Sequence, residues 1–128
     1  MNLENYVKII VTPLINVKEE ISKEGQSTWY DSNMLKESLG DILTFDLVIV
    51  DGPSGDSTPF ARYSAIPFLK DKISTSFSVF LDDTHRDEEI EIVNDWYEIL
   101  GGKLKGYNRY YHLGNNIKYN TSPFGNKH

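Results

Sequence analysis

The sequence has no cysteine, few basic groups and no long apolar run, and each absence excludes a class of function. Without a thiol in 128 residues, disulfide bonds, thiolate zinc sites, iron–sulfur clusters and cysteine nucleophiles are excluded. Thirteen Lys and Arg against nineteen Asp and Glu give a formal net charge of −6, so a nucleic-acid partner is not expected. The run Leu47–Val50 is far shorter than the ~20 residues that cross a bilayer, so no membrane partner is expected. The first residues carry no signal-peptide pattern, and we expect a cytoplasmic protein.

What is present is the composition of one ordinary globular domain. With 39% apolar and 25% charged residues, a chain of this length can bury a core of its own. No repeat, low-complexity tract or long linker divides the sequence. We therefore predict a single α/β domain over residues 1–128, in which residues 115–128 form a loose polar tail.

Short apolar segments recur along the chain and end at turn-forming or acidic residues. Val7–Val11, Phe45–Val50 and Phe77–Leu81 are nearly continuous in apolar character, which is typical of strands buried in a parallel sheet. Residues 103–107 and 109–113 are aromatic and alternating, and they predict an antiparallel pair at a sheet edge.

Helical patterns lie between and after these strands. Residues 31–39 predict a helix with Asp31 at its N-cap, and residues 62–73 predict a second helix that Pro67 starts late or kinks. The third predicted helix follows Thr84, its expected cap, and ends at a pair of glycines. Its apolar stripe consists of Ile90, Val93, Trp96, Tyr97 and Leu100.

Residues 14–30 fit neither pattern, and we expect a long loop there, or a short helix near Val17–Ile21. Strands and helices otherwise alternate along the chain. That order predicts an α/β fold with helices packed on a mostly parallel sheet, ending in an antiparallel C-terminal strand.

Acidic residues follow two of the predicted parallel strands. Asp51 comes directly after the second strand, and Asp82 and Asp83 follow the third. If the two strands are neighbours, the three carboxylates converge, and a hard divalent cation such as Mg²⁺ or Mn²⁺ relieves their repulsion. The alternative is that Asp82 and Asp83 cap the next helix while Asp51 serves the Gly-Pro turn.

Other polar and aromatic residues near these strand ends are candidate site residues. His85 and Arg86 fit a general base and an anion contact, or a solvated loop before a helix. Arg62, Tyr63 and Trp29 are candidate substrate contacts. The alternative is an exposed Arg in a first helical turn and two packed aromatic residues.

Taken in order, several of these pieces resemble a known family. The sequence resembles the C-terminal half of class I S-adenosylmethionine-dependent methyltransferases. The residues that carry this resemblance are, in order, Asp51-Gly52-Pro53, Arg62-Tyr63, Asp82-Asp83 with Arg86, and Trp96. The likeness covers roughly residues 5–100, and a more distant one exists to the glucuronoxylan O-methyltransferase group. The resemblance implies a Rossmann-like sheet of strand order 3-2-1-4-5-7-6, S-adenosylmethionine as cofactor, and a hydroxyl of a sugar or other small molecule as methyl acceptor.

The resemblance also implies roles for individual residues. Asp51, Gly52 and Pro53 match a strand end beside the cofactor. In metal-dependent members such as catechol O-methyltransferase, acids after the fourth and fifth strands hold Mg²⁺, and these places match Asp51 and Asp82-Asp83. The catechol-type lysine is replaced here by Ser54, which leaves His85 as the nearby base.

The sequence departs from the family in lacking the E/D-x-G-x-G turn and the acid-ended strand that bind the cofactor. We expect a methyltransferase-type sheet truncated at its N-terminus and incomplete or inactive alone. Phe45–Val50 would then be an edge strand, unless Val7–Val11 slides against it. An apolar edge without charge or proline invites dimerisation, aggregation or pairing with a complementing N-terminal fragment.

Two other functions stay open. One is a non-catalytic α/β binding or metal-binding module that self-associates through the open edge. The other is a metal-dependent phosphotransfer or hydrolase domain using Asp51, Asp82 and Asp83, although no phosphate-binding glycine loop precedes a helix.

Overall fold

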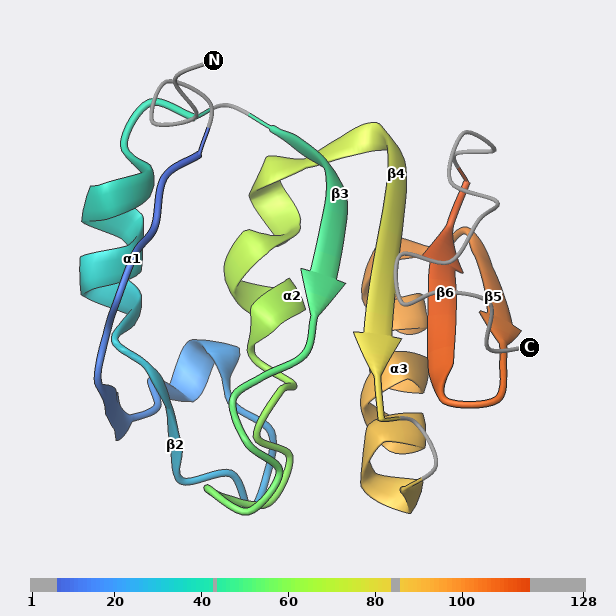
Figure 1. Cartoon of the computed structure of the whole chain (residues 1–128), viewed down its shortest axis with the longest axis horizontal. Coiled ribbons are helices and arrows are strands. Elements are labelled where there is room, and N and C mark those ends of the chain that lie inside the picture. Colours follow the sequence, from blue (N-terminus) through green and yellow to red (C-terminus); the bar gives the residue numbers. More distant parts are fainter. Residues whose placement is uncertain (1–6, 43, 84–85, 116–128) are drawn as a thin grey trace.

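A computed structural model describes residues 7–42, 44–83 and 86–115 and has an α/β fold with two sheets (Figure 1). The strands of the main sheet are β3 (Phe45–Val50), β4 (Ile73–Asp82), β5 (Lys103–Gly106) and β6 (Tyr110–Gly114). The α-helices are α1 (Ser32–Leu39), α2 (Ala65–Leu69) and α3 (Asp87–Leu100). A small sheet pairs β1 (Leu14–Asn16) with β2 (Thr28–Tyr30), and the 3₁₀ turns are η2 (Glu19–Ile21) and η3 (Lys70–Lys72).

The main sheet has the order β3-β4-β6-β5. β3 and β4 are parallel, whereas β6 is antiparallel to both β4 and β5. The predicted antiparallel pair at a sheet edge is therefore confirmed. The mostly parallel sheet is a mixed one instead, with one parallel pairing, because a short turn joins β5 to β6 and such a turn reverses the chain.

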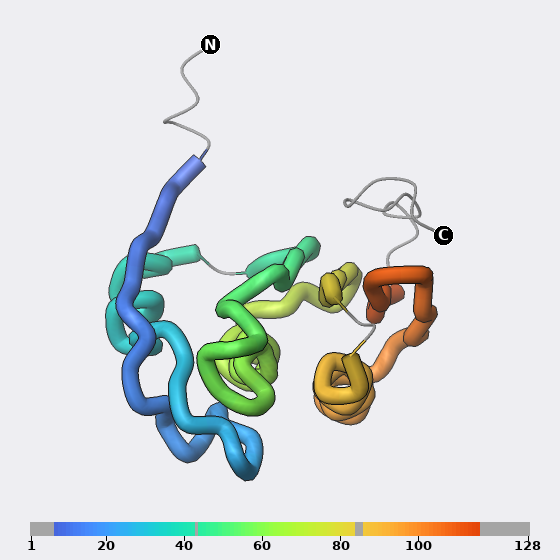
Figure 2. Tube along the Cα trace, turned by 60° about the horizontal axis from the view of Figure 1, so that its bottom comes forward, coloured from blue at the N-terminus to red at the C-terminus, as the bar shows by residue number. Residues whose placement is uncertain are grey.

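Helices α2 and α3 lie on the same face of the main sheet, as Figure 2 shows. The pleat directs Phe77, Val79 and Leu81 of β4 into the core that these helices cover. Ile66 of α2 and Trp96 of α3 meet them there and are fully buried. Each such side chain contributes about 1.5–3 kcal/mol by its removal from water.

Helix α3 forms as predicted, but its buried face differs from the predicted stripe. Ile92 is fully buried and Tyr97 is 41% exposed, so the prediction that Tyr97 belongs to the core is wrong. The buried face is centred on Val93 and Trp96 and includes Glu89, which places Tyr97 at its margin. Arg86 occupies the N-cap position of α3, and the predicted cap, Thr84, lies outside the described residues.

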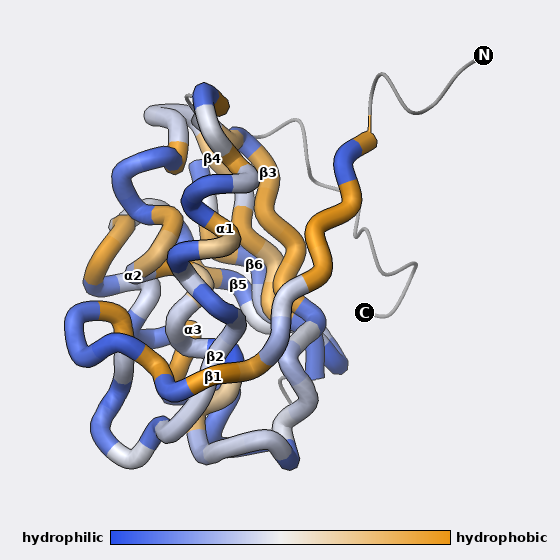
Figure 3. The backbone as a smooth tube through the Cα atoms, turned by 90° about the vertical axis from the view of Figure 1, so that its left-hand side faces the viewer, coloured by the Kyte–Doolittle hydropathy of each residue, from blue (hydrophilic) through white to orange (hydrophobic). Residues whose placement is uncertain are grey.

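The predicted first strand, Val7–Val11, is wrong. Its residues are extended without strand pairing, and Val7, Ile9 and Val11 are 58%, 84% and 81% exposed. In Figure 3 this apolar stretch is the end of the coloured tube nearest the N label, and it runs outward from the rest of the fold. β-branched residues favour strands because they pack against neighbouring strands, and no described strand pairs with this segment.

The segment before α1 is more regular than the predicted loop. Residues 14–30 form the antiparallel pair β1 and β2 around η2, which falls within the short helix considered near Val17–Ile21. Asp31 caps α1 as predicted, with its carboxylate accepting from the backbone N–H groups of Asn33 and Met34.

The second predicted helix is shorter than residues 62–73. Pro67 is the third residue of α2, a first-turn position where no intrahelical N–H donor is needed, so a late start is confirmed. Ile73 already belongs to β4, which extends four residues beyond the predicted Phe77 start. Across the described residues, none of the helices has both the length and the apolar character needed to cross a bilayer.

Candidate metal and substrate site

The parallel pair β3 and β4 brings three aspartates to one edge of the main sheet. Val50 pairs with Leu81, so Asp51 and Asp82 follow side by side at the carboxyl ends of these strands. One carboxylate oxygen from each of Asp51, Asp82 and Asp83 lies within 4.8 Å of the others. These three residues form what we call the aspartate cluster, and the expected convergence is present.

The electrostatics of the aspartate cluster favour binding of a cation. Burial, followed by the neighbouring charge of Asp82, raises the pKa of Asp51, while the charge of Arg62 acts in the opposite direction. Asp82 and Asp83 do not occupy the N-cap of α3, which is Arg86, so the interpretation that they cap this helix is wrong. Carboxylate oxygens at this spacing are the donors that Mg²⁺ and Mn²⁺ prefer.

Arg62 is the fixed cation of the site and is not the exposed first-turn arginine considered from the sequence. Its side chain is only 5% exposed. Nε donates to the carbonyl oxygen of Pro53 at 3.1 Å, and Nη1 donates to the carbonyl oxygen of Asp82 at 3.2 Å. Nη2 lies 3.3 Å from Asp83 and 3.9 Å from Asp51, so one guanidinium joins the ends of both strands.

Arg86 covers the loop that follows β3. A Cβ atom built on Gly55 would lie 1.9 Å from Nη1 of Arg86, so the guanidinium rests directly on the glycine. Nη2 of Arg86 donates to Glu89 at 2.6 Å, and the backbone N–H of Phe60 donates to the carboxylate of Glu88. The first turn of α3 therefore holds the loop over residues 54–60 from two points.

Sequence reasoning missed Glu89, whose carboxylate is buried behind Arg86. Burial raises its pKa and the charge of Arg86 opposes this shift, while Oε2 has no hydrogen-bond partner within the described ranges. Glu89 lies on the same helical face as Ile92, Val93 and Trp96, and this spacing could have predicted its burial from the sequence.

The other predicted site residues are more scattered. The carbonyl oxygen of Tyr63 accepts from Trp96 Nε1 at 2.9 Å, and its ring lies near Lys23 rather than near the aspartates. Trp29 is buried in the core against Phe68, with ring centroids 5.4 Å apart. Gly52 lies beside the hydroxyl of Tyr30, from which an added Cβ would be 3.0 Å away. His85, the predicted base, lies outside the described residues.

Comparison with known proteins gives no relative. No protein-family model matches the chain, and no curated protein or solved structure matches it significantly. Functional inference therefore rests on the strand order and on the geometry of the strand ends.

Proposed function

We propose that this chain is a methyltransferase-like protein carrying the metal and substrate half of an S-adenosylmethionine-dependent O-methyltransferase. The observation that supports this most is the strand order β3-β4-β6-β5 with β6 reversed between β4 and β5. Strands 4-5-7-6 of the family order correspond to it one by one, with the last strand inserted antiparallel. The aspartate cluster lies at the strand ends where ligands of open α/β sheets gather.

In this proposal Asp51, Asp82 and Asp83 hold Mg²⁺ or Mn²⁺. The ion would supply orientation of two substrate oxygens and a lowered pKa for the hydroxyl that attacks the methyl group. Arg62 keeps the two strand ends together, because it bonds a backbone carbonyl from each. Arg86, 36% exposed in its side chain, is placed to contact an anionic or polar part of the substrate. His85 stays the proposed base.

The proposal includes a complementing segment beside β3. Along its outer edge β3 pairs with no strand of the described chain, and its Ile49 is 46% exposed. The Gly-rich turn that binds the cofactor is absent from the sequence. A segment that adds strands to β3 and carries such a turn would complete the cofactor surface next to Asp51, Gly52 and Pro53.

Three measurements test this proposal. Calorimetry of the chain alone with S-adenosylmethionine should give no tight binding, and the coding sequence upstream of Met1 should specify a strand and a Gly-rich turn in the same or a shifted frame. Co-expression of that segment should then give a complex that binds S-adenosylmethionine. Micromolar binding by the chain alone would contradict the missing cofactor surface, and absence of the upstream motif would contradict the methyltransferase assignment.

The open edge of β3 also favours a second candidate, a non-catalytic binding module that self-associates. Self-association through β3 needs neither cofactor nor cation. It is distinguished from the first candidate by a stable homodimer that persists when the aspartate cluster is neutralised and that binds no S-adenosylmethionine with any complementing segment.

A further inference from the structure

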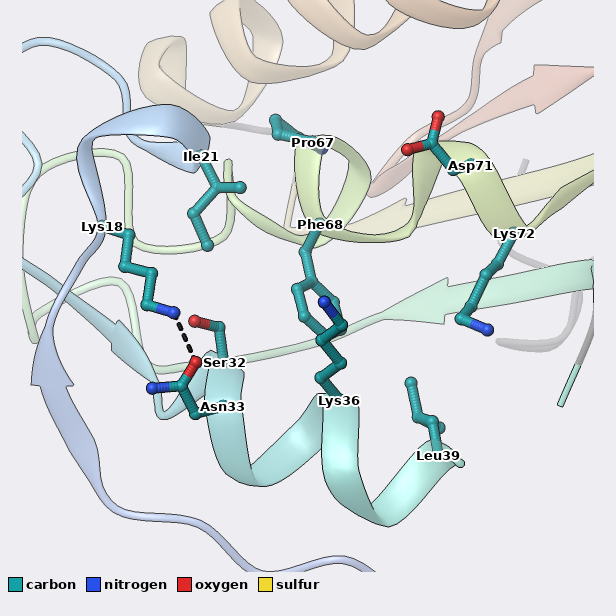
Figure 4. Close-up of a pocket in the computed structure, with 10 residues that line it drawn as sticks. All are labelled: Lys18, Ile21, Ser32, Asn33, Lys36, Leu39, Pro67, Phe68, Asp71 and Lys72. Carbon is teal, nitrogen blue, oxygen red and sulfur yellow. Dashed lines mark hydrogen bonds between the residues drawn. The ribbon is translucent and has the colours of Figure 1, made fainter. Parts of the chain in front are cut away.

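A pocket of about 310 Å³ lies between α1 and the α2–η3 segment (Figure 4). It shares no residue with the aspartate cluster and lies on a different part of the fold. Its apolar wall comes from η2, α1 and α2 and consists of Ile21, Leu39, Pro67 and Phe68. The volume is at the small end of the range for small-molecule sites.

Ser32 provides a polar group inside this pocket. The residue is 8% exposed, and its hydroxyl makes no hydrogen bond with any residue that the structure describes. Figure 4 shows the hydroxyl directed from the first turn of α1 toward the ends of Lys18 and Ile21. The residue is buried as a whole but lines the pocket, so a ligand atom placed in the pocket can accept from this hydroxyl.

The rim of the pocket is positively charged, although the protein as a whole is acidic. Lys18, Lys36 and Lys72 contribute three cations and Asp71 one anion, whereas the whole chain has a formal net charge of −6. Lys18 donates to the side chain of Asn33, and Lys72 donates to the carbonyl oxygen of Ile42 at 2.6 Å.

Lys36 is the cation without a partner. Its ammonium group makes no ion pair or hydrogen bond with the described residues. In Figure 4 it extends from α1 toward α2, while Phe68 extends from α2 toward α1. A cation free to pair and an aromatic ring therefore face the same space.

The N-terminus of α1 does not itself supply the anion site. Its first free N–H groups, those of Asn33 and Met34, already bond the carboxylate of Asp31. The attraction for an anion comes instead from the lysine side chains. Asp71 on the opposite rim disfavours a ligand of high negative charge.

We propose that this pocket binds a small organic monoanion, in which a compact apolar body packs on Phe68 and Ile21 and a carboxylate meets Ser32 and Lys36. The apolar wall provides the burial, the Ser32 hydroxyl donates to the carboxylate, and Lys36 supplies the opposite charge. The site is independent of the proposed methyltransferase function, because neither its residues nor its ligand are needed there.

The test is an NMR titration of the full chain with three probes of one length: octanoate, octan-1-ol and octylammonium. Octanoate should give saturable amide shifts centred on Ser32, Lys36 and Phe68, with affinity at least several-fold above that for octan-1-ol. Octylammonium should give none. Equal affinity for octanoate and octan-1-ol, shifts elsewhere, or no saturable shift up to the solubility limit would overturn the proposal.

Matched variants separate the pocket from general electrostatics. Lys36→Gln should weaken octanoate binding about fivefold, the upper range for one exposed ion pair, whereas Lys70→Gln on the neighbouring exposed position should not. Ser32→Ala should weaken it as well, whereas Ser38→Ala in the same helix should not. Equal losses in the control variants would assign the binding to overall charge and would contradict a built site. Unchanged amide spectra outside the pocket verify that each variant is folded.

Discussion

The Nη2 atom of Arg62 lies 3.3 Å from a carboxylate oxygen of Asp83. The same guanidinium uses its other nitrogens on the backbone carbonyls of Pro53 and Asp82. Its charge is thus shared between the carboxylates of Asp83 and Asp51, while its geometry is fixed by neutral acceptors. The aspartate cluster keeps more negative than positive charge, which is the condition for holding a divalent cation.

We expect Arg62→Ala to lower the free energy of unfolding by about 2–4 kcal/mol, because one buried and one partly buried carbonyl lose their donor and the aspartates lose their counter-charge. Arg62→Lys should recover only part of this loss, since an ammonium group cannot reproduce the planar fork. Chemical denaturation measures both. Arg109→Ala, at an exposed position, is the control and should change stability by less than about 0.5 kcal/mol. A loss for Arg62→Ala as small as that of the control would show that the strand ends are held by other contacts.

The effect of Asp51→Asn on thermal stability should change sign when a divalent cation is added. Without a divalent cation, Asp51→Asn should raise the melting temperature slightly, because the raised pKa of Asp51 reflects burial and repulsion of its ionised form. With Mn²⁺ at a hundred times its dissociation constant, the natural chain should gain about 2.7 kcal/mol and the variant should gain much less. Thermal unfolding of both chains with and without Mn²⁺ or Mg²⁺ measures this change in the order of their melting temperatures.

Asp82→Asn and Asp83→Asn should also lose most of the Mn²⁺ stabilisation. Asp46→Asn, an exposed change on β3 outside the cluster, should keep all of it. The same Mn²⁺ stabilisation in the natural chain and in these three variants would mean that Asp82 and Asp83 bind no metal.

The unpaired outer edge of β3 predicts self-association of the chain at micromolar concentration or above. Lysine at position 49 should oppose this, because a charge on an edge strand resists pairing with another chain. Ile49 and Ile99 are similarly exposed, at 46% and 38%, on β3 and α3. Sedimentation velocity should show Ile49→Lys shifted to monomer and Ile99→Lys unchanged. A natural chain that sediments as a monomer at all concentrations would refute the prediction.

Much of the fold could be predicted from the sequence because its core elements have strong local signals. Phe45–Val50 appears as a strand at the predicted positions, and α1 and α3 begin and end close to theirs. The predicted strand at Val7–Val11 is wrong because the sequence pattern indicates β propensity only. It does not indicate whether a neighbouring strand is there to pair with.

The candidate site was predictable only in part. The convergence of Asp51 with Asp82 follows from placing two parallel strands side by side, which periodicity already indicates. The burial of Arg62 does not follow from any local pattern. It depends on the loop after β3 returning so that Pro53 and Asp82 meet the same guanidinium, which is a tertiary property.

Trp96 and Trp29 differ in whether the indole N–H has a hydrogen-bond partner, and this difference predicts unequal costs of substitution. Trp96→Phe should cost about 1–2 kcal/mol more than Trp29→Phe, although both indoles are buried. Trp96 Nε1 donates to the carbonyl oxygen of Tyr63, which the substitution leaves without its donor. Trp29 Nε1 is buried without a described partner, so its removal relieves an unpaired group. Parallel urea titrations decide the order, and equal costs would contradict this interpretation.

His112 predicts a pH dependence of stability. Burial, followed by the charge of Lys105, lowers the pKa of His112 below its ordinary 6.5. The unfolded chain therefore binds a proton first, so the free energy of unfolding should fall as pH decreases from 6.5 and should level off below the folded pKa. Gln at position 112 keeps a polar partner for Ser78, 3.0 Å from His112 Nε2, without titrating. Unfolding curves over this window should be flatter for His112→Gln, and equal slopes would exclude His112 as the cause.

Gly55 couples a surface loop to the interior of α3. Because the Arg86 guanidinium rests on Gly55, a methyl group there would displace it. Glu89, which is 1% exposed, would then lose its charge partner inside the core. Amide hydrogen exchange in the first turn of α3 consequently becomes a readout of how the loop after β3 is seated, so a change at the strand ends can be followed from a helix whose residues lie outside the aspartate cluster.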